Sequence, residues 1–133
     1  MNKLTLLFYT TILSMNIQAQ EKALSPLEVV QQQLDAYNKQ DIKAFAAVFA
    51  ENVLVYNKIG DTKPAIQGRM AVEKRYGELF IKYPKNYSTL IGRIVEGDYV
   101  IDHEVVTGRD QLVRIVAIYE VKNGQISQCW FIR

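Results

Sequence analysis

The last third of the chain, residues 87–133, alternates apolar and polar side chains, and this pattern constrains the fold of the 133-residue sequence more than any other feature. Three turn signals divide it into four strand-like segments: Glu96-Gly97-Asp98, Gly108-Arg109-Asp110 and Asn123-Gly124. An Asn-Gly pair between alternating apolar residues is a strong signal for a β-hairpin. We therefore predict an antiparallel sheet whose last three strands form a meander.

The first half of the chain carries helical signals instead. Ser25 and Glu28 form a predicted capping box, and the apolar residues that follow recur at helical spacing. Asp41 is the predicted cap of a short second helix, a strand follows over residues 51–60, and a third helix spans about 69–83. Helices followed by a long sheet indicate an α+β fold with the helices on one face and a pocket beneath them.

Residues 1–20 have the layout of a secretory signal peptide. Lys3 precedes an apolar run over residues 4–13, which is too short to span a bilayer, and the small residue Ala19 suits a cleavage site. An uncleaved amphipathic start is the alternative interpretation. We expect one exported domain over residues 21–133, either periplasmic or secreted.

The net charge and the cysteine content limit which partners and cofactors we expect. The net charge is +2, and removal of the leader, which holds one lysine and no acid, lowers it to +1. With lysines and arginines scattered singly, we expect neither nucleic acid nor, after cleavage of the leader, a membrane as partner. Cys129 and His103 are the single cysteine and histidine, and no glycine-rich phosphate loop is present. We therefore expect no metal and no cofactor.

From about Leu24 to Arg133 the chain resembles the SnoaL-like and ketosteroid-isomerase-like branch of the nuclear transport factor 2-like superfamily. The resemblance rests on three segments in this order: VVQQQLDAYNKQDIKAFAAVFAENVLVY, IQGRMAVEKRYGELF and AIYEVKNGQISQCWFIR. It implies a cone in which three N-terminal helices pack on a curved antiparallel sheet around a pocket. This fold carries isomerases, dehydratases, cyclases and non-catalytic binding domains alike, so the resemblance does not settle the function.

The resemblance also implies that the usual isomerase residues are missing. In that family a carboxylate moves the proton, while a Tyr and a protonated Asp stabilise the substrate oxygen. Asn57 falls at the position of the base, Gln33 at that of the Tyr and Ala117 at that of the Asp. A one-residue slip would place Tyr56 at the base position, where a pKa of about 10 makes it a poor base. Only Tyr76 matches a supporting tyrosine of the isomerase pocket.

The same alignment predicts side-chain directions in VIDHEVVTGR, residues 100–109. If Ala117 faces the pocket, Asp102 and Glu104 on the neighbouring strand face it too, about 7 Å apart, and His103 points outward. One of the two acids then has a pKa raised towards neutrality and serves as a general acid or base. Alternatively, they belong to a structural ion-pair network with Arg75, Arg114 or Arg133. A register shift of one residue would make His103 the pocket base instead, so all three remain catalytic candidates.

The predicted ligand contacts are ring, hydroxyl and amide groups around an apolar interior: Gln33, Tyr37, Tyr56, Asn57, Tyr76, Tyr119 and Phe131. They suit a small, mostly apolar molecule with one or two oxygens. Two functions stay open: cofactor-free acid–base catalysis of isomerase, dehydratase or hydrolase type, and a non-catalytic ligand-binding or association module.

The opposite face of the predicted sheet is also apolar; its residues are Ile101, Val105, Leu112, Val116, Ile118, Trp130 and Ile132. A sheet face in contact with water normally alternates into polar residues, and no further predicted helix remains to cover this one. We therefore expect a homodimer through the sheet.

Overall fold

The computed structural model describes residues 21–133, so the predicted signal peptide lies outside the described residues. The elements in chain order are α1 (Pro26–Lys39), α2 (Ile42–Ala47), β1 (Phe49–Tyr56), β2 (Ile66–Gln67), α3 (Arg69–Lys82), β3 (Tyr87–Glu96), β4 (Tyr99–Thr107), β5 (Val113–Lys122) and β6 (Gln125–Ile132). Over the described part of the chain, none of the helices combines the length and the apolar character that a membrane crossing requires.

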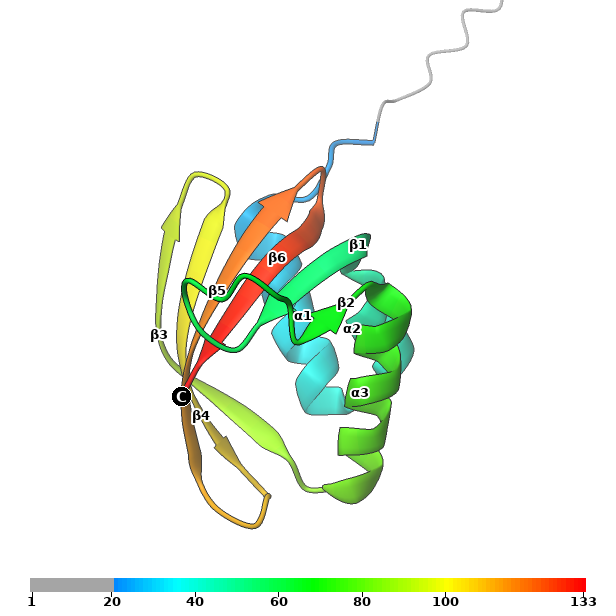
Figure 1. Ribbon diagram of the computed structural model, residues 1–133, viewed down its shortest axis with the longest axis vertical. Coiled ribbons are helices and arrows are strands. Elements are labelled where there is room, and N and C mark those ends of the chain that lie inside the picture. The colour runs from blue at the N-terminus through cyan, green and yellow to red at the C-terminus, as the bar shows by residue number, and fades with distance from the viewer. Residues whose placement is uncertain (1–20) are drawn as a thin grey trace, which may run out of the picture.

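The six strands form one sheet in the order β2-β1-β6-β5-β4-β3, and β3 to β6 are the predicted antiparallel meander (Figure 1). The turn between β5 and β6 has positive φ at both Asn123 and Gly124, as a tight two-residue hairpin requires. The prediction of a purely antiparallel sheet is wrong at one pair, because β1 runs parallel to β6. An alternation of apolar residues reports that a strand exists but not which neighbour it takes or in which direction, so the sequence pattern could not show this.

All three helices lie on one side of the sheet, which curves around them (Figure 1). Two of them precede the first strand and α3 lies between β2 and β3, in agreement with the predicted order in which a strand precedes the third helix. The capping box at Ser25 and Glu28 is present, and the Asp41 side chain accepts a hydrogen bond from the Ala44 amide. The local signals that begin these helices therefore act as predicted.

Aromatic rings fill the space between the helices and the β1 side of the sheet. Phe45 is fully buried, and its ring centroid lies 4.6 Å from Tyr76, 5.1 Å from Phe49 and 5.9 Å from both Tyr37 and Phe80. These contacts join α1, α2, β1 and α3 into one core.

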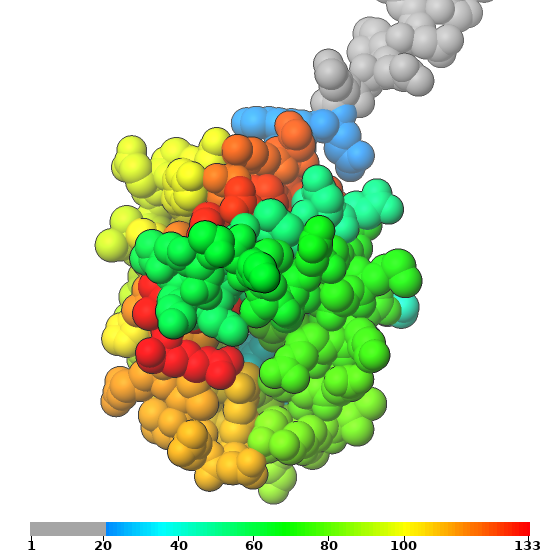
Figure 2. Space-filling model, viewed as in Figure 1, coloured from blue at the N-terminus to red at the C-terminus, as the bar shows by residue number. Residues whose placement is uncertain are grey.

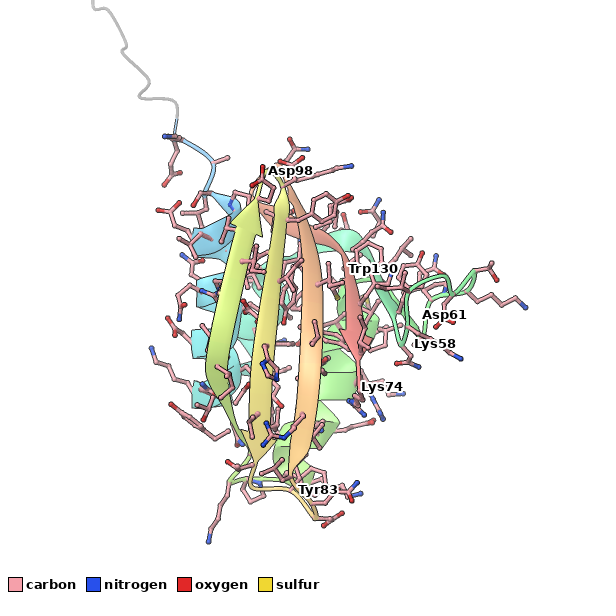
Figure 3. All side chains as sticks on the ribbon, turned by 90° about the vertical axis from the view of Figure 1, so that its left-hand side faces the viewer. Lys58, Asp61, Lys74, Tyr83, Asp98 and Trp130 are labelled. Carbon is pink, nitrogen blue, oxygen red and sulfur yellow. The ribbon has the colours of Figure 1, made fainter. Side chains whose placement is uncertain are left out.

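The outer face of the sheet carries no helix in the described part of the chain (Figure 3). Trp130 on β6 stacks on Tyr56 of the neighbouring strand β1, with centroids 5.7 Å apart and planes at 14°. The remaining apolar residues of this face are partly exposed, and Leu112 is 57% exposed. A homodimer through this face stays a prediction.

Candidate functional site

Strand β4 directs its two acids into the interior and its histidine out of it. Asp102 is fully buried and Glu104 is 7% exposed, whereas His103 is exposed on the outer face. Their partners on β5 agree, because Asp102 pairs with the buried Ala117 and Glu104 pairs with Ile115. The predicted side-chain directions are therefore confirmed, and the alternative register that would place His103 in the pocket is wrong.

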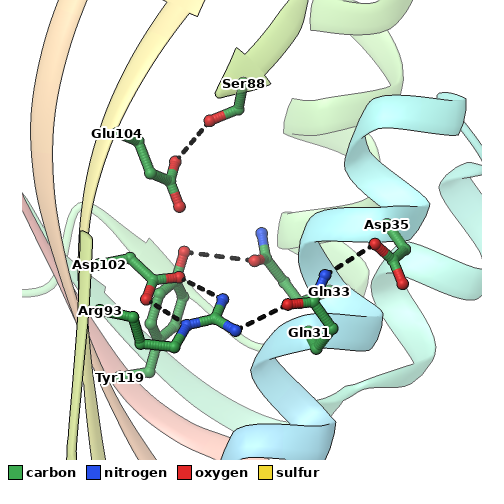
Figure 4. Close-up of polar contacts among 8 residues, drawn as sticks. All are labelled: Gln31, Gln33, Asp35, Ser88, Arg93, Asp102, Glu104 and Tyr119. Atoms are coloured by element: carbon green, nitrogen blue, oxygen red, sulfur yellow. Dashed lines mark hydrogen bonds and ion pairs between the residues drawn. The ribbon is translucent and has the colours of Figure 1, made fainter. Parts of the chain in front are cut away.

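Asp102 is held by a two-pronged ion pair with Arg93 from β3 (Figure 4). Arg93 Nε lies 2.6 Å from Oδ1 and Nη2 lies 2.8 Å from Oδ2, while Nη1 donates to Gln31 Oε1 at 2.7 Å. The hydrogen bond to Asp102 raises the pKa of Arg93. Both carboxylate oxygens of Asp102 thus bind a permanent cation, which matches the predicted alternative of a structural ion pair.

The arginine of this pair is not among the three that the sequence analysis named. The signal was nevertheless present in the turn between β3 and β4. A two-residue turn at Gly97-Asp98 pairs Glu96 with Tyr99, and the same register continued outward pairs Arg93 with Asp102. Counting from the turn would have placed Arg93 beside the acid.

Glu104 differs from Asp102 in having one carboxyl oxygen without a partner. Its Oε2 accepts a hydrogen bond from the Ser88 hydroxyl at 2.8 Å, but its buried Oε1 has no partner among the described residues. Burial raises the pKa of Glu104 and the nearby charge of Asp102 adds to the rise, while Ser88 and Arg93 oppose it. A buried carboxyl of this kind is poised to exchange a proton with a bound molecule.

Glu104 lines an inner cavity of about 40 Å³, which has room for a few atoms. The residues that line this inner cavity are Gln33, Leu34, Tyr37, Tyr76, Glu104, Val106, Arg109, Val113, Ile115, Tyr119, Phe131 and Arg133. An outer recess of about 390 Å³ adjoins it and is lined by Val55, Asn57, Ala65, Ile66, Arg75, Tyr76, Leu79, Arg109, Phe131 and Arg133. The two spaces share four residues, and Figure 2 shows a hollow in this region between α3, the C-terminal end of β6 and the β4–β5 turn.

Two tyrosines, the buried Tyr119 and the partly buried Tyr76, line the inner cavity. The Tyr119 hydroxyl donates to Gln33 Oε1 at 3.3 Å, and in Figure 4 these groups lie on the side towards which Glu104 points. Burial raises the pKa of both Tyr119 and Tyr76. Both hydroxyls therefore keep their protons at neutral pH. Tyr119 donates its proton to Gln33, whereas Tyr76 donates to no described residue and can donate a hydrogen bond to a ligand oxygen.

The structure brings most of the predicted ligand contacts together. Five line the inner cavity, namely Gln33, Tyr37, Tyr76, Tyr119 and Phe131, and Asn57 lines the outer recess. Tyr56 does not join them, because it lies on the outer face of the sheet against Trp130. Successive residues of a strand face opposite sides, and Val55 rather than Tyr56 has the inward position on β1.

Arg109 is a site residue that the sequence analysis missed. It follows Gly108 in the β4–β5 turn, donates from Nε to Asn86 Oδ1 at 2.7 Å and from Nη2 to the Tyr37 hydroxyl at 2.6 Å, and lines both spaces. The Tyr37 hydroxyl in turn donates to Asn86 Oδ1 at 3.0 Å. A turn residue has no periodic pattern to mark its direction, so no local signal could reveal it.

Several solved structures resemble this fold. A cystatin-fold protein from Novosphingobium aromaticivorans shares 24% identity over 84% of this chain and 100% of its own, with a TM-score of 0.76. A candidate polyketide cyclase from Sinorhizobium meliloti shares 18% over 81% and 99%, with a TM-score of 0.67. A candidate ketosteroid isomerase from Kribbella flavida shares 21% over 80% and 76%, also at 0.67. Comparison with curated proteins gives no match.

The curved mixed sheet, the helices on its inner side and these similarities define an α+β domain of the nuclear transport factor 2-like class. The model of the SnoaL-like domain family matches residues 30–129. The chain therefore belongs to the SnoaL-like domain family, as its sequence segments indicated.

Proposed function

We propose that this protein binds a small, mostly apolar molecule in the inner cavity and outer recess, and that Glu104 performs cofactor-free acid–base chemistry on it. The observation that carries the proposal is that Glu104 lines the cavity and that its buried Oε1 has no partner among the described residues. An unsatisfied buried polar atom costs about 1–3 kcal/mol, and a bound molecule that offers a proton or hydrogen bond would offset this cost.

The surrounding groups divide the work in this proposal. Glu104, with its raised pKa, gives or takes the proton, while the Tyr76 hydroxyl donates a hydrogen bond to a substrate oxygen. Tyr119, whose hydroxyl donates to Gln33, forms part of the wall that orients the substrate. Asp102 has a structural role in this proposal because Arg93 binds both of its oxygens, and its charge helps to keep the Glu104 pKa high. The reaction is of isomerase, dehydratase or hydrolase type.

The similar structures support an enzymatic function, because two of them carry the names of a candidate polyketide cyclase and a candidate ketosteroid isomerase. Asn57, Gln33 and Ala117 at the usual isomerase positions oppose the familiar isomerase route. The same three residues favour the competing function, a non-catalytic ligand-binding or association module. In that case the inner cavity binds its ligand and Glu104 transfers no proton.

Deuterium exchange separates the two functions. We would incubate the protein in D₂O with a panel of small cyclic ketones and hydroxyketones and follow label at carbons next to the carbonyl by mass spectrometry. The proposal predicts exchange that Glu104→Gln reduces by at least 100-fold, while Glu96→Gln, an exposed carboxylate on β3, has no effect. Exchange that survives in Glu104→Gln would refute the role of Glu104, and ligand binding without exchange would support the non-catalytic module.

The proposal also includes export and a homodimer. The leader-like layout of residues 1–20 supports export, and the mass of the protein recovered from the exported fraction would test cleavage after Ala19. The uncovered apolar outer face supports a dimer. Sedimentation velocity would show a species of twice the monomer mass that Val116→Glu dissociates; a monomeric wild type would contradict this part.

A further inference from the structure

The outer recess is lined by more positive charge than its surroundings neutralise. Arg75, Arg109 and Arg133 line it, and the same three arginines border an adjoining hollow of about 320 Å³ together with Lys82. Glu78 is the one acid among the lining residues of that hollow, and the recess itself has none.

None of the three guanidinium groups forms an ion pair within the described residues. The ion pairs there join Lys43 to Glu73, Arg93 to Asp102 and Lys122 to Glu120. Arg93 shows what a satisfied interior arginine looks like in this protein, since an acid occupies two of its nitrogens. The arginines of the recess are in the opposite state, with their positive charges unmatched.

Arg109 is also held in place without being neutralised. Its Nε and Nη2 donate to the uncharged oxygens of Asn86 and Tyr37, and its Nη1 makes no hydrogen bond to the described residues. The turn that carries it packs closely, because a Cβ on Gly108 would lie 1.9 Å from the Lys85 carbonyl oxygen. Arg109 thus lines the recess, is held in place by neutral partners and has one nitrogen without a hydrogen bond to the described residues. Such a guanidinium is preorganised to bind an anion.

We propose that the ligand is an organic carboxylate with an apolar body, whose carboxylate binds Arg109, Arg133 and Arg75 in the outer recess. This inference rests on the proposed function, because it names the class of molecule that the same site accepts. The rest of the recess suits the apolar body, since Val55, Ile66 and Leu79 contribute to its wall.

The charges also fix the direction in which the ligand lies. Glu104 lines the inner cavity but not the outer recess, and it repels a carboxylate when ionised. Arg109 and Arg133 line both spaces and Arg75 lines the outer recess, so the positive charge extends outward, away from Glu104. The two spaces share Tyr76 and Phe131, so a molecule can extend from one into the other along these rings. The carboxylate therefore stays outside and the uncharged end reaches Glu104.

The test compares two probes of the same shape by isothermal titration calorimetry: 4-phenylbutyrate and the uncharged 4-phenylbutanol. The proposal predicts at least 10-fold tighter binding of the acid at low ionic strength, and this preference weakens as salt is added. Arg109→Met keeps the side-chain stem and should remove most of the preference, as should Arg75→Met combined with Arg133→Met. Arg114→Met, an exposed arginine on β5 that lines neither space, should leave it unchanged. Thermal unfolding of each variant shows whether it is folded.

Equal binding of acid and alcohol, or binding of neither, would overturn this inference. Its failure is distinguishable from failure of the proposed function, because the preference for the acid does not require proton transfer. If Glu104→Gln retains the preference and no ketone exchanges deuterium, the carboxylate site stands and the catalytic role falls. If Arg109→Met binds both probes as the wild type does and ketone exchange still depends on Glu104, the reverse holds.

Discussion

Asp102 and Glu104 stand two residues apart on one strand and face the same interior, yet their surroundings differ. Arg93 occupies both oxygens of Asp102, while Ser88 binds one oxygen of Glu104 and no described residue binds the other. Burial is nearly equal at the two positions, so burial alone does not mark a functional acid. The difference lies in pairing, and for this reason the proposed function gives a structural role to the first acid and a chemical role to the second.

The arginines repeat this contrast. Arg93 is matched by a carboxylate, whereas Arg109 is held by neutral oxygens and faces the outer recess. Glu104, the acid without a charge partner among the described residues, and Arg109, the cation without one, lie at the same end of the interior, since both line the inner cavity. A ligand that offers a hydrogen bond to Glu104 and a negative charge to Arg109 would give both groups a partner.

The largest effect on the free energy of unfolding is expected at the buried ion pair of Arg93 and Asp102. Replacing one member of the buried pair, by Arg93→Met or Asp102→Leu, leaves the other charge unpaired and should lower the free energy of unfolding by about 3–5 kcal/mol. The double variant should be more stable than either single variant, because it removes both charges together. Urea denaturation of the four proteins measures this, and additive losses would show that the pair is not coupled.

A smaller effect is expected at the turn that carries Arg109. Gly108→Ala places a methyl group against the Lys85 backbone in a residue with φ of +78°, and should lower the free energy of unfolding by about 2–3 kcal/mol. Gly97→Ala is the matched control, because its φ is +55° but its added methyl meets nothing within 4 Å. Its expected loss is about 1 kcal/mol, the cost of the left-handed backbone alone. Equal losses in the two variants would argue against close packing of the Gly108 turn.

Glu104→Gln should raise stability at neutral pH by about 1 kcal/mol, because it removes a buried charge whose Oε1 is unpaired. A carboxyl whose pKa is raised by folding favours the folded state fully below its ordinary value of 4.5 and loses this contribution as pH rises through the folded value. Wild type and variant should therefore be most alike in acid and diverge towards neutral pH. Thermal unfolding across this pH range measures the difference, and a constant gap would contradict the raised pKa.

The smallest effect is expected at His103, which lies on the outer face and away from the inner cavity. His103→Gln should change the free energy of unfolding by less than about 0.5 kcal/mol and leave the exchange of deuterium into ketones intact. Loss of exchange in this variant would mean that the outer face, rather than the interior, holds the reactive group.

The sequence predicted which side chains of a strand face the same side, but it predicted the pairing between strands only in part. The family resemblance placed Ala117 in the pocket, and from there Asp102 and Glu104 were correctly placed inside because side chains alternate along any strand. The parallel pairing of β1 with β6 was not predictable, since it joins segments far apart in the chain.

The parts of the candidate site that escaped prediction depend on tertiary placement. Arg109 lies in a turn, and the hydrogen bonds that orient it come from Tyr37 on α1 and from Asn86 between α3 and β3. The Glu104 Oε1 is free because no hydrogen-bond donor of the described residues packs against it. Neither feature leaves a periodic mark in the sequence.

The central claim is that Glu104 is a buried acid without a charge partner, and its titration tests this most directly. Carbon-13 NMR of the side-chain carboxyl carbons, with the Glu104 signal assigned by its absence in Glu104→Gln, gives the pKa of this residue in the intact protein. The account predicts a midpoint above 4.5, raised by burial and by Asp102. A midpoint at or below 4.5 would contradict it, because a carboxyl that ionises so readily must be either solvated or paired with a positive charge.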